Sequence, residues 1–138
     1  MVYMFLAEGF EECEALIPLD ILRRANIETK TVGVTGKNVC GSHNIEMVCD
    51  EQIENIEFSS EISAIILPGG MPGTIHLGEC KLLCDEVVKA YENGKKIAAI
   101  CAAPTVFGKL GLLNGKMACC YPGMEDQLTG AEATTSSV

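Results

Sequence analysis

Short apolar runs alternate with amphipathic stretches along this 138-residue chain, and this alternation constrains its fold more than any other feature. Continuous apolar runs are typical of strands covered on both faces, whereas apolar residues at helical spacing are typical of helices. The predicted strands cover residues 2–7, 28–34, 45–49, 62–67, 97–100 and 116–120, and the predicted helices cover 11–26, 80–93 and 102–110. The pattern predicts a single α/β domain over residues 1–138, with a mostly parallel sheet and helices on both faces.

The charge balance excludes several classes of partner. Lys and Arg number 10 and Asp and Glu number 19, which gives a formal net charge of −9. Such a chain repels a phosphate backbone, so neither nucleic acid nor an anionic membrane is expected as a partner. The longest apolar stretch, 97–107, contains Pro104 and falls short of the roughly 20 residues of a membrane span. The N-terminus turns acidic at Glu8 and is not typical of a secretory signal, which favours a cytoplasmic protein.

Cysteines are unusually frequent in this chain. Without a secretory signal, reduced thiols are expected rather than a disulfide framework. No Cys-x-x-Cys pair occurs, and neither His43 nor His76 lies near a cysteine pair of ligand spacing, so no metal site is expected. Most of the thiols are expected to be small core residues. The eight are Cys13, Cys40, Cys49, Cys80, Cys84, Cys101, Cys119 and Cys120.

Three of the predicted strands end in residues suited to chemistry. Ligands of open α/β sheets bind beyond the carboxyl ends of the strands. The first strand is followed by Glu8-Gly9 and an acidic helix start, and the strand over 62–67 runs into Pro68-Gly69-Gly70, whose amides are not covered by side chains. The strand over 97–100 leads into Cys101. The sequence therefore predicts a site at this edge of the sheet.

Cys101 is the candidate nucleophile. It lies between a strand and a helix among small neighbours, the arrangement of a nucleophile elbow. A thiol at a helix N-terminus is expected to have a lowered pKa. The amides of Ala102 and Gly70 are candidate oxyanion-hole donors, because glycine lets the backbone approach a substrate closely. The alternative from spacing alone is that Cys101 is a small buried residue at the junction.

Glu14 is the candidate acid-base partner of Cys101. The strands over 2–7 and 97–100 are expected to be neighbours in the sheet, which would bring the first helix close to the thiol. The alternative is that the acids at 11, 12 and 14 are solvated residues of a first helical turn, which is the expectation for two of the three.

Two further residues lie near the predicted site in sequence. His76 is expected to be a loop residue rather than a catalytic base. Tyr121, which precedes Pro122, is expected to pack against its neighbours, with a position over the cavity as the alternative.

Three motifs together resemble the ThiJ/PfpI family, in its order and spacing and over nearly the whole chain. They are Glu8-Gly9-Phe10-Glu11-Glu12-Cys13-Glu14 with Ile17-Pro18-Leu19-Asp20, then Leu67-Pro68-Gly69-Gly70 with Gly73, and Ala98-Ala99-Ile100-Cys101-Ala102-Ala103-Pro104. The resemblance implies a flavodoxin-like three-layer sandwich in which Cys101 is the reactive cysteine and Glu14 hydrogen-bonds to it. It implies that the amides of Gly70 and Ala102 face the thiolate. It also implies a homodimer formed around the first helix, with Arg24 as a candidate interface residue.

Departures from the family pattern modify these expectations. Ala102 stands where the PfpI-like proteases carry a histidine, which argues against a peptidase. Tyr121 stands where the deglycase-like branch often has a histidine, so a Cys-His pair is not available at that place. His43 stands where that branch often has an arginine. We therefore expect a modified pocket rim, with Gly69, Tyr121 and His43 as its residues.

Family members continue beyond the position of Val138 through a further strand and a C-terminal helix. The chain is therefore expected to be C-terminally incomplete relative to the family. The remainder is expected as a separate chain of the same gene product, and a shortened chain is the alternative.

The resemblance implies a thiol enzyme for small reactive carbonyls, such as methylglyoxal, glyoxal or their early adducts on proteins. Cys101 would form a hemithioacetal and Glu14 would transfer a proton, with no metal or organic cofactor required. The alternative is a redox sensor or stress chaperone that signals through oxidation of Cys101 to the sulfinic acid. A role in thiamine-precursor metabolism is suggested only by the family name.

Overall fold

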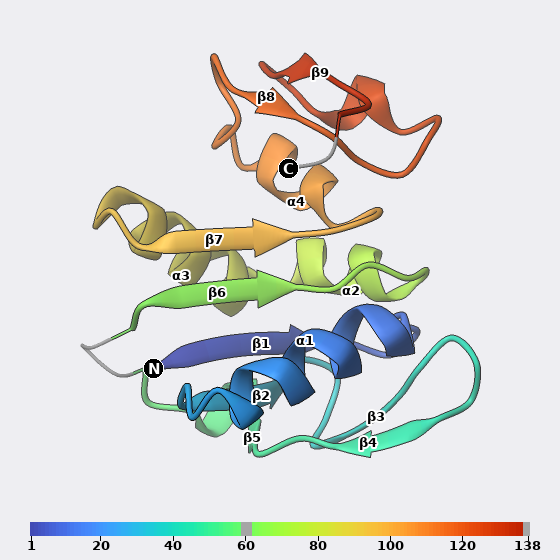
Figure 1. Cartoon of the computed structure of the whole chain (residues 1–138), viewed down its shortest axis with the longest axis vertical. Coiled ribbons are helices and arrows are strands. Elements are labelled where there is room, and N and C mark those ends of the chain that lie inside the picture. Colours follow the sequence, from blue (N-terminus) through green and yellow to red (C-terminus); the bar gives the residue numbers. More distant parts are fainter. Residues whose placement is uncertain (59–61, 137–138) are drawn as a thin grey trace.

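A central parallel sheet organises the protein and confirms the α/β fold class. The computed structural model describes residues 1–58 and 62–136, and within this part five strands pair in the order β5-β2-β1-β6-β7 (Figure 1). Every pairing in this sheet is parallel. The strands are β1 Val2–Leu6, β2 Thr29–Gly33, β5 Glu51–Gln52, β6 Ala64–Leu67 and β7 Lys96–Ala99.

Helices cover both faces of this sheet, α1 on one face and α2 and α3 on the other (Figure 1). The helices are α1 Glu12–Arg24, α2 Gly73–Glu79, α3 Lys81–Glu92 and α4 Pro104–Lys109, with 3-10 turns η1 Ile53–Asn55 and η2 Glu125–Gln127. The arrangement is the expected three-layer sandwich.

Strand β1 separates two apolar cores, because successive side chains of a strand point to opposite faces. Tyr3 and Phe5 belong to the larger core, which includes Leu83 of α3. Met4 and Leu6 belong to the smaller core with residues of α1. All five residues of β1 are buried, which explains its continuous apolar sequence.

The expected pairing of the first strand with the strand over 97–100 is wrong. Strand β6 lies between them, since Met4 of β1 is in register with Ile66 of β6, and Ile66 is in register with Ala98 of β7. Strand order depends on how the crossovers wind around the sheet, and the local apolar pattern does not encode it.

The segment between β2 and β6 also differs from expectation. The predicted strand over 45–49 is β4, Glu46–Val48, and it does not extend the main sheet. It forms an antiparallel hairpin with β3, Asn38–Cys40, which is not among the predicted strands. The main sheet ends instead at β5, which pairs with β2.

Beyond β7 the regular structure is shorter than expected. The helix expected from residue 102 begins at Pro104, and the strand expected over 116–120 is β8, Met117–Ala118. Strand β8 pairs in parallel with β9, Glu132–Ala133, in a separate two-stranded sheet.

An apolar cavity of about 490 Å³ lies beside α1 at β6 and β7. Its lining includes Ile17 and Pro18 from α1, Ile66 from β6, and Ile100, which follows β7. Across residues 1–58 and 62–136, the helices fall short of the length and apolar character needed to cross a membrane.

Candidate active site

Cys101 lies on a tight turn two residues after the end of β7. Its φ angle is +60°, a conformation that residues with a side chain rarely adopt. The turn is held because the Cys101 carbonyl accepts a hydrogen bond from the Tyr121 amide at 2.7 Å. Strained backbone of this kind concentrates at functional sites, where the surrounding structure maintains it. The geometry is that of the predicted elbow.

The thiol of Cys101 lies where three parts of the chain meet. The backbone amides of Gly70 and Ala102 donate hydrogen bonds to the sulfur, and a side-chain hydrogen bond links the sulfur to Glu14. Each of these partners was a predicted site residue. Glu14 reaches the thiol from the first turn of α1 even though β6 separates β1 from β7.

Glu14 is fixed at both its backbone and its side chain. Glu11 is the N-cap of α1, and its Oε2 accepts a hydrogen bond from the Glu14 amide at 2.7 Å. Oε2 of Glu14 accepts a hydrogen bond from the Gly69 amide at 2.8 Å. The Glu11 amide in turn donates to the Gly69 carbonyl at 3.0 Å. The carboxylate is therefore anchored to the loop after β6.

The two glycines of this loop are required by close contacts. A Cβ atom at Gly69 would lie 2.7 Å from Oε2 of Glu14 and 2.8 Å from Cβ of Cys101. Gly70 has a φ of +92°, and a Cβ there would collide with the backbone nitrogen of Glu11. The backbone can therefore approach the thiol only because side chains are absent at both positions.

The pKa of Cys101 is raised above its ordinary value, so the predicted lowering is wrong. Burial raises this pKa most, and the charge of Glu14 and its hydrogen bond raise it further. Hydrogen bonds from the amides of Ala102 and Gly70 lower it, but by less. Helix α4 begins only at Pro104, three residues after the thiol, so Cys101 does not lie in its first turn.

The charge of Glu14 disfavours the thiolate form of Cys101, because a thiolate beside a carboxylate would place two like charges in a partly buried site. The arrangement can therefore pass a single proton between sulfur and carboxylate.

A cavity of about 340 Å³ opens onto Cys101. Its lining is Gly70, Met71, Cys101, Ala102, Tyr121, Pro122 and Met124. Tyr121 is 57% exposed and lines this cavity, which matches the alternative expectation for it. Met71 and Met124 were not predicted. Each directly follows a Pro-Gly turn motif, Pro68-Gly69-Gly70 or Pro122-Gly123, and this is the sequence signal by which they could have been found.

His43 is not among the residues that line this cavity. It lies against Glu12, the buried acid of the first helical turn: the His43 amide donates to Oε1 of Glu12 at 2.6 Å, and Nδ1 lies 2.9 Å from Oε2. Burial raises the pKa of Glu12, but the hydrogen bonds from His43 outweigh it and bring the pKa to about 2. The same hydrogen bond and charge raise the pKa of His43.

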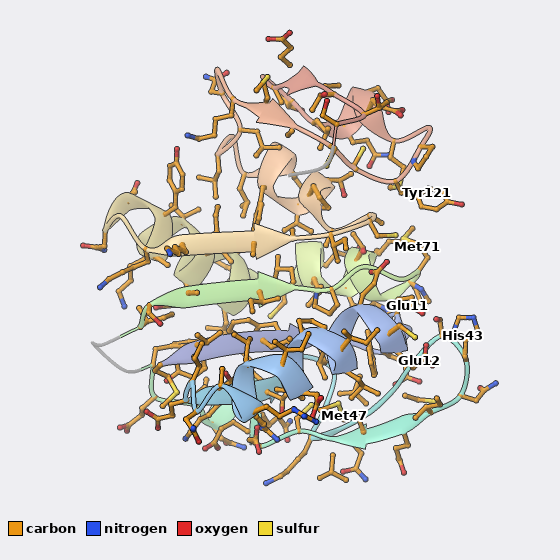
Figure 2. The ribbon with its side chains drawn as sticks, in the orientation of Figure 1. Glu11, Glu12, His43, Met47, Met71 and Tyr121 are labelled. Carbon is orange, nitrogen blue, oxygen red and sulfur yellow. The ribbon has the colours of Figure 1, made fainter. Side chains whose placement is uncertain are left out.

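Several of these side chains point toward the end of the sheet at which the strand arrows end (Figure 2). The labelled ones are Glu11, Glu12, His43, Met71 and Tyr121. Within residues 1–58 and 62–136, one group of side chains has the spacing to hold a metal ion, with ligand atoms within 4.8 Å, and it is Glu11, Glu12 and His43. In this group Glu12 already accepts hydrogen bonds from His43 and from Oγ of Ser42.

Two other predicted residues lie outside this constellation. His76 is in helix α2 rather than in a loop, and its Nδ1 lies 3.0 Å from the carbonyl oxygen of Glu8. Arg24 is exposed near the end of α1, 4.0 Å from Asp20 of the same helix.

Comparison with known proteins places this geometry in context. The sequence profile of the DJ-1/PfpI family matches residues 1–137. The chain is 38% identical over 126 residues to protein dj-1beta of Drosophila melanogaster, which covers 91% of this chain and 67% of that protein. It is 38% identical over 134 residues to DJ-1 homolog B of Arabidopsis thaliana, covering 96% of this chain but only 30% of that protein. It is 28% identical to a deglycase of Pyrococcus horikoshii, covering 95% of this chain and 78% of that protein.

Solved structures agree with the sequence comparison. A DJ-1 superfamily protein of Salmonella typhimurium superposes with a TM-score of 0.91 at 31% identity, covering 98% of this chain and 74% of that one. An oxidized DJ-1 of Toxoplasma gondii superposes with a TM-score of 0.85 at 35% identity, covering 91% of this chain and 69% of that one. The family match over nearly every residue, together with these structures, confirms the predicted relationship: the chain belongs to the DJ-1/PfpI family.

Proposed function

We propose that this protein is a cysteine-dependent enzyme that acts on small reactive carbonyl compounds. One observation carries the proposal: the thiol of Cys101 receives hydrogen bonds from two backbone amides, is paired with the carboxylate of Glu14, and faces a cavity of about 340 Å³. A nucleophile, a proton carrier and oxyanion donors are the components that addition to a carbonyl requires.

The first step is addition of the Cys101 sulfur to the aldehyde carbon. As the carbon-sulfur bond forms, the thiol proton passes to the Glu14 carboxylate, which lies within hydrogen-bond reach. The amides of Gly70 and Ala102 stabilise the negative charge that develops on the carbonyl oxygen. Glu14 then returns the proton to this oxygen, which gives a neutral hemithioacetal and restores the carboxylate.

With methylglyoxal, the second step is an internal redox shift. The Glu14 carboxylate removes the hydrogen, as a proton, from the carbon bonded to sulfur and delivers it to the neighbouring carbon, while the hydroxyl proton of the hemithioacetal moves to the ketone oxygen. The former ketone thus becomes an alcohol and the former aldehyde carbon becomes the carbonyl carbon of a thioester. Water then cleaves the thioester, which releases lactate and restores the Cys101 thiol. One water molecule is consumed, and no external oxidant or reductant is needed.

The cavity favours small substrates. Its volume of about 340 Å³ is near the lower end for ligand sites. The side chains of Met71, Tyr121 and Met124 contribute apolar surface, so methylglyoxal and glyoxal fit the proposal better than charged compounds. Early adducts of these carbonyls on proteins would approach through the same opening.

Relatives support the enzymatic reading. The deglycase of Pyrococcus horikoshii is named for its activity, and it aligns with 95% of this chain. This chain spans 78% of that protein and 67% of dj-1beta, and the activity proposed here is that of the site formed by its own residues.

The decisive experiment follows methylglyoxal consumption and lactate formation by the purified protein. We expect turnover by the wild type and none by Cys101→Ser. Cys84→Ser is the matched control, because its sulfur donates to the carbonyls of Leu77 and Gly78, outside the cavity, and we expect it to retain activity. Equal consumption by wild type and Cys101→Ser would refute the proposal.

A redox function is the second candidate. The observation that favours it is that the DJ-1 of Toxoplasma gondii has been solved in an oxidized form. Glu14 in its protonated form would hydrogen-bond to a sulfinic acid at Cys101. Stable oxidation of Cys101 in a protein without carbonyl turnover would favour this candidate.

We further propose that the protein forms a homodimer through α1. Ile17 and Ile21 lie one turn apart on this helix and are 58% and 60% exposed. Neighbouring apolar side chains that are this exposed are typical of a protein-protein interface. Arg24 is exposed at the end of the same helix. Light scattering is expected to give twice the chain mass of 14.7 kDa, and Ile21→Glu is expected to shift it to the monomer. A monomeric wild type would refute this.

A further inference from the structure

A second cysteine lies beside the reactive one. The Tyr121 amide donates to the Cys101 carbonyl at 2.7 Å, and Cys120 is the residue that precedes this amide. Standard backbone dimensions limit the separation of the Cys101 and Cys120 Cα atoms to about 7.5 Å for a straight path, and any bend shortens it. The Cα atoms of disulfide-bonded cysteines lie about 4.4–6.8 Å apart. The backbone at Cys101 and Cys120 therefore needs to move by less than about 1 Å, if at all, for their Cα atoms to reach this range.

The two thiols also interact electrostatically. Burial raises the pKa of Cys120 most, and the charges of Glu125, Cys119, Asp126 and, least of these, Cys101 raise it further. Both side chains are partly accessible. The Cys120 sulfur donates to the carbonyl oxygen of Tyr121 at 3.4 Å, and its side chain packs against the edge of the larger core. A disulfide with Cys101 therefore requires the Cys120 side chain to give up this contact.

Other cysteines are placed differently. Cys49 is buried, with a pKa raised to about 11 because of burial and the charge of Asp50. Cys84 donates to carbonyl groups of α2. Cys119 is next to Cys120 in sequence, but the register of the Tyr121 hydrogen bond makes Cys120 the closer backbone neighbour of Cys101.

We propose that Cys120 is a resolving thiol, which forms a disulfide with Cys101 after Cys101 has been oxidised by a hydroperoxide. The Cys101 thiolate attacks the distal peroxide oxygen, so sulfur is oxidised to the sulfenic acid and the peroxide is reduced to water or an alcohol. The Cys120 thiolate then attacks the Cys101 sulfur. A sulfur-sulfur bond forms, the sulfenic oxygen leaves as hydroxide, and the Cys120 proton converts it to water.

This step gives the site a reversible oxidised state. Formation of the disulfide competes with a second peroxide, which would produce the sulfinic acid. It also removes the nucleophile, so carbonyl turnover stops until a thiol reductant restores Cys101. The inference rests on the reactivity of Cys101 that the proposed function assumes.

The test treats the full chain with about two molar equivalents of hydrogen peroxide, enough for the sulfinic acid, and maps non-reduced peptides by mass spectrometry. We expect wild type and the matched control Cys119→Ser to lose two hydrogen atoms and to yield a peptide pair linked through residues 101 and 120. Cys120→Ser is expected to gain two oxygen atoms at Cys101 instead. Methylglyoxal turnover before oxidation is expected to be equal in wild type and Cys120→Ser. After oxidation, dithiothreitol is expected to restore turnover in wild type and Cys119→Ser but not in Cys120→Ser.

Oxidation of the wild type to the sulfinic acid without a linked peptide pair would overturn the inference, as would a disulfide from Cys101 to another cysteine that forms equally in wild type and Cys120→Ser. Both results leave the proposed function intact, because they still identify Cys101 as the reactive thiol. If peroxide and iodoacetamide leave Cys101 unmodified while other cysteines react, both the inference and the proposed function fail.

Discussion

Oε2 of Glu14 accepts a hydrogen bond from the Gly69 amide at 2.8 Å, although the two residues are 55 positions apart in the sequence. The acid of the site is thus anchored to the loop after β6. This strand lies between β1, which precedes Glu14, and β7, which precedes Cys101. This bond uses one carboxylate oxygen as an acceptor, which orients the group toward the sulfur. It explains why a first-turn glutamate of α1 serves a thiol two strands away.

Glu14→Gln is expected to preserve the fold but to impair turnover. The amide oxygen of glutamine still accepts the hydrogen bond from Gly69, whereas the side chain no longer exchanges a proton with Cys101. Carbonyl turnover should fall at least about 100-fold, the lower range for a positioned acid-base group. Glu79→Gln makes the same charge change on an exposed residue and should retain activity. Unchanged turnover in Glu14→Gln would limit Glu14 to a structural role.

Gly69→Ala is expected to displace the pair. The added methyl group would lie 2.7 Å from Oε2 of Glu14 and 2.8 Å from Cβ of Cys101, so one of them has to move. A displacement of this size at a reacting centre reduces turnover on the order of 100-fold. In Gly78→Ala the methyl group lies 3.5 Å from Val106, an ordinary contact, so this control should remain active. Steady-state kinetics with methylglyoxal distinguishes the two variants.

Cys101→Gly is expected to be inactive yet more stable than Cys101→Ala. The φ of +60° suits glycine and strains alanine, so the difference in unfolding free energy should be about 1 kcal/mol in favour of glycine. Ala102 does not have a positive φ, so Ala102→Gly should instead reduce stability by roughly 0.5–1 kcal/mol. Urea denaturation measures both. A less stable Cys101→Gly would mean that the turn is not strained.

The Glu12–His43 pair is expected to give stability a two-sided dependence on pH. The pKa of Glu12 is about 2 in the folded protein against an ordinary 4.5, so its contribution is present above pH 4.5 and is lost as the pH falls toward 2. The pKa of His43 is raised above 6.5, so its contribution is present below pH 6.5 and is lost as the pH rises through the raised value.

The variant that tests this pair is His43→Ala. Its urea midpoint should fall below that of the wild type at pH 6, and the difference should shrink at pH 9. His76→Ala removes a ring that faces a neutral carbonyl, so its effect should not depend on pH in this way. An equal deficit of His43→Ala at both pH values would contradict the ion pair.

Much of this architecture was accessible from the sequence. The continuous apolar runs located β1, β6 and β7. Only β1 is buried at every residue, as expected of a strand covered on both faces, whereas the residues of β7 alternate between exposed and half-buried. The β3–β4 hairpin was missed in part, because residues around Asn38 carry turn chemistry although they pair with Val48. Pairing across a hairpin is a tertiary choice that short polar segments do not reveal.

The site was found for partly wrong reasons. The proximity of Glu14 and Cys101 was predicted from adjacent strands, whereas the contact actually runs past β6 with the help of Gly69. The direction of the Cys101 pKa shift was wrong because the start of α4 at Pro104 and the depth of the thiol depend on the three-dimensional turn. Motif spacing identified the participants but did not determine their electrostatic balance.

The parallel sheet order described above also has a consequence for biosynthesis. The acid, the amides and the thiol arrive on segments that touch only after β1, β6 and β7 have paired, and pairings of such long sequence separation form slowly. While a chain is being made, Cys101 is one thiol among eight. Cys101 differs chemically from the other thiols only after the sheet has formed. The rate at which Cys101 becomes selectively reactive during refolding therefore measures the rate at which the native sheet assembles.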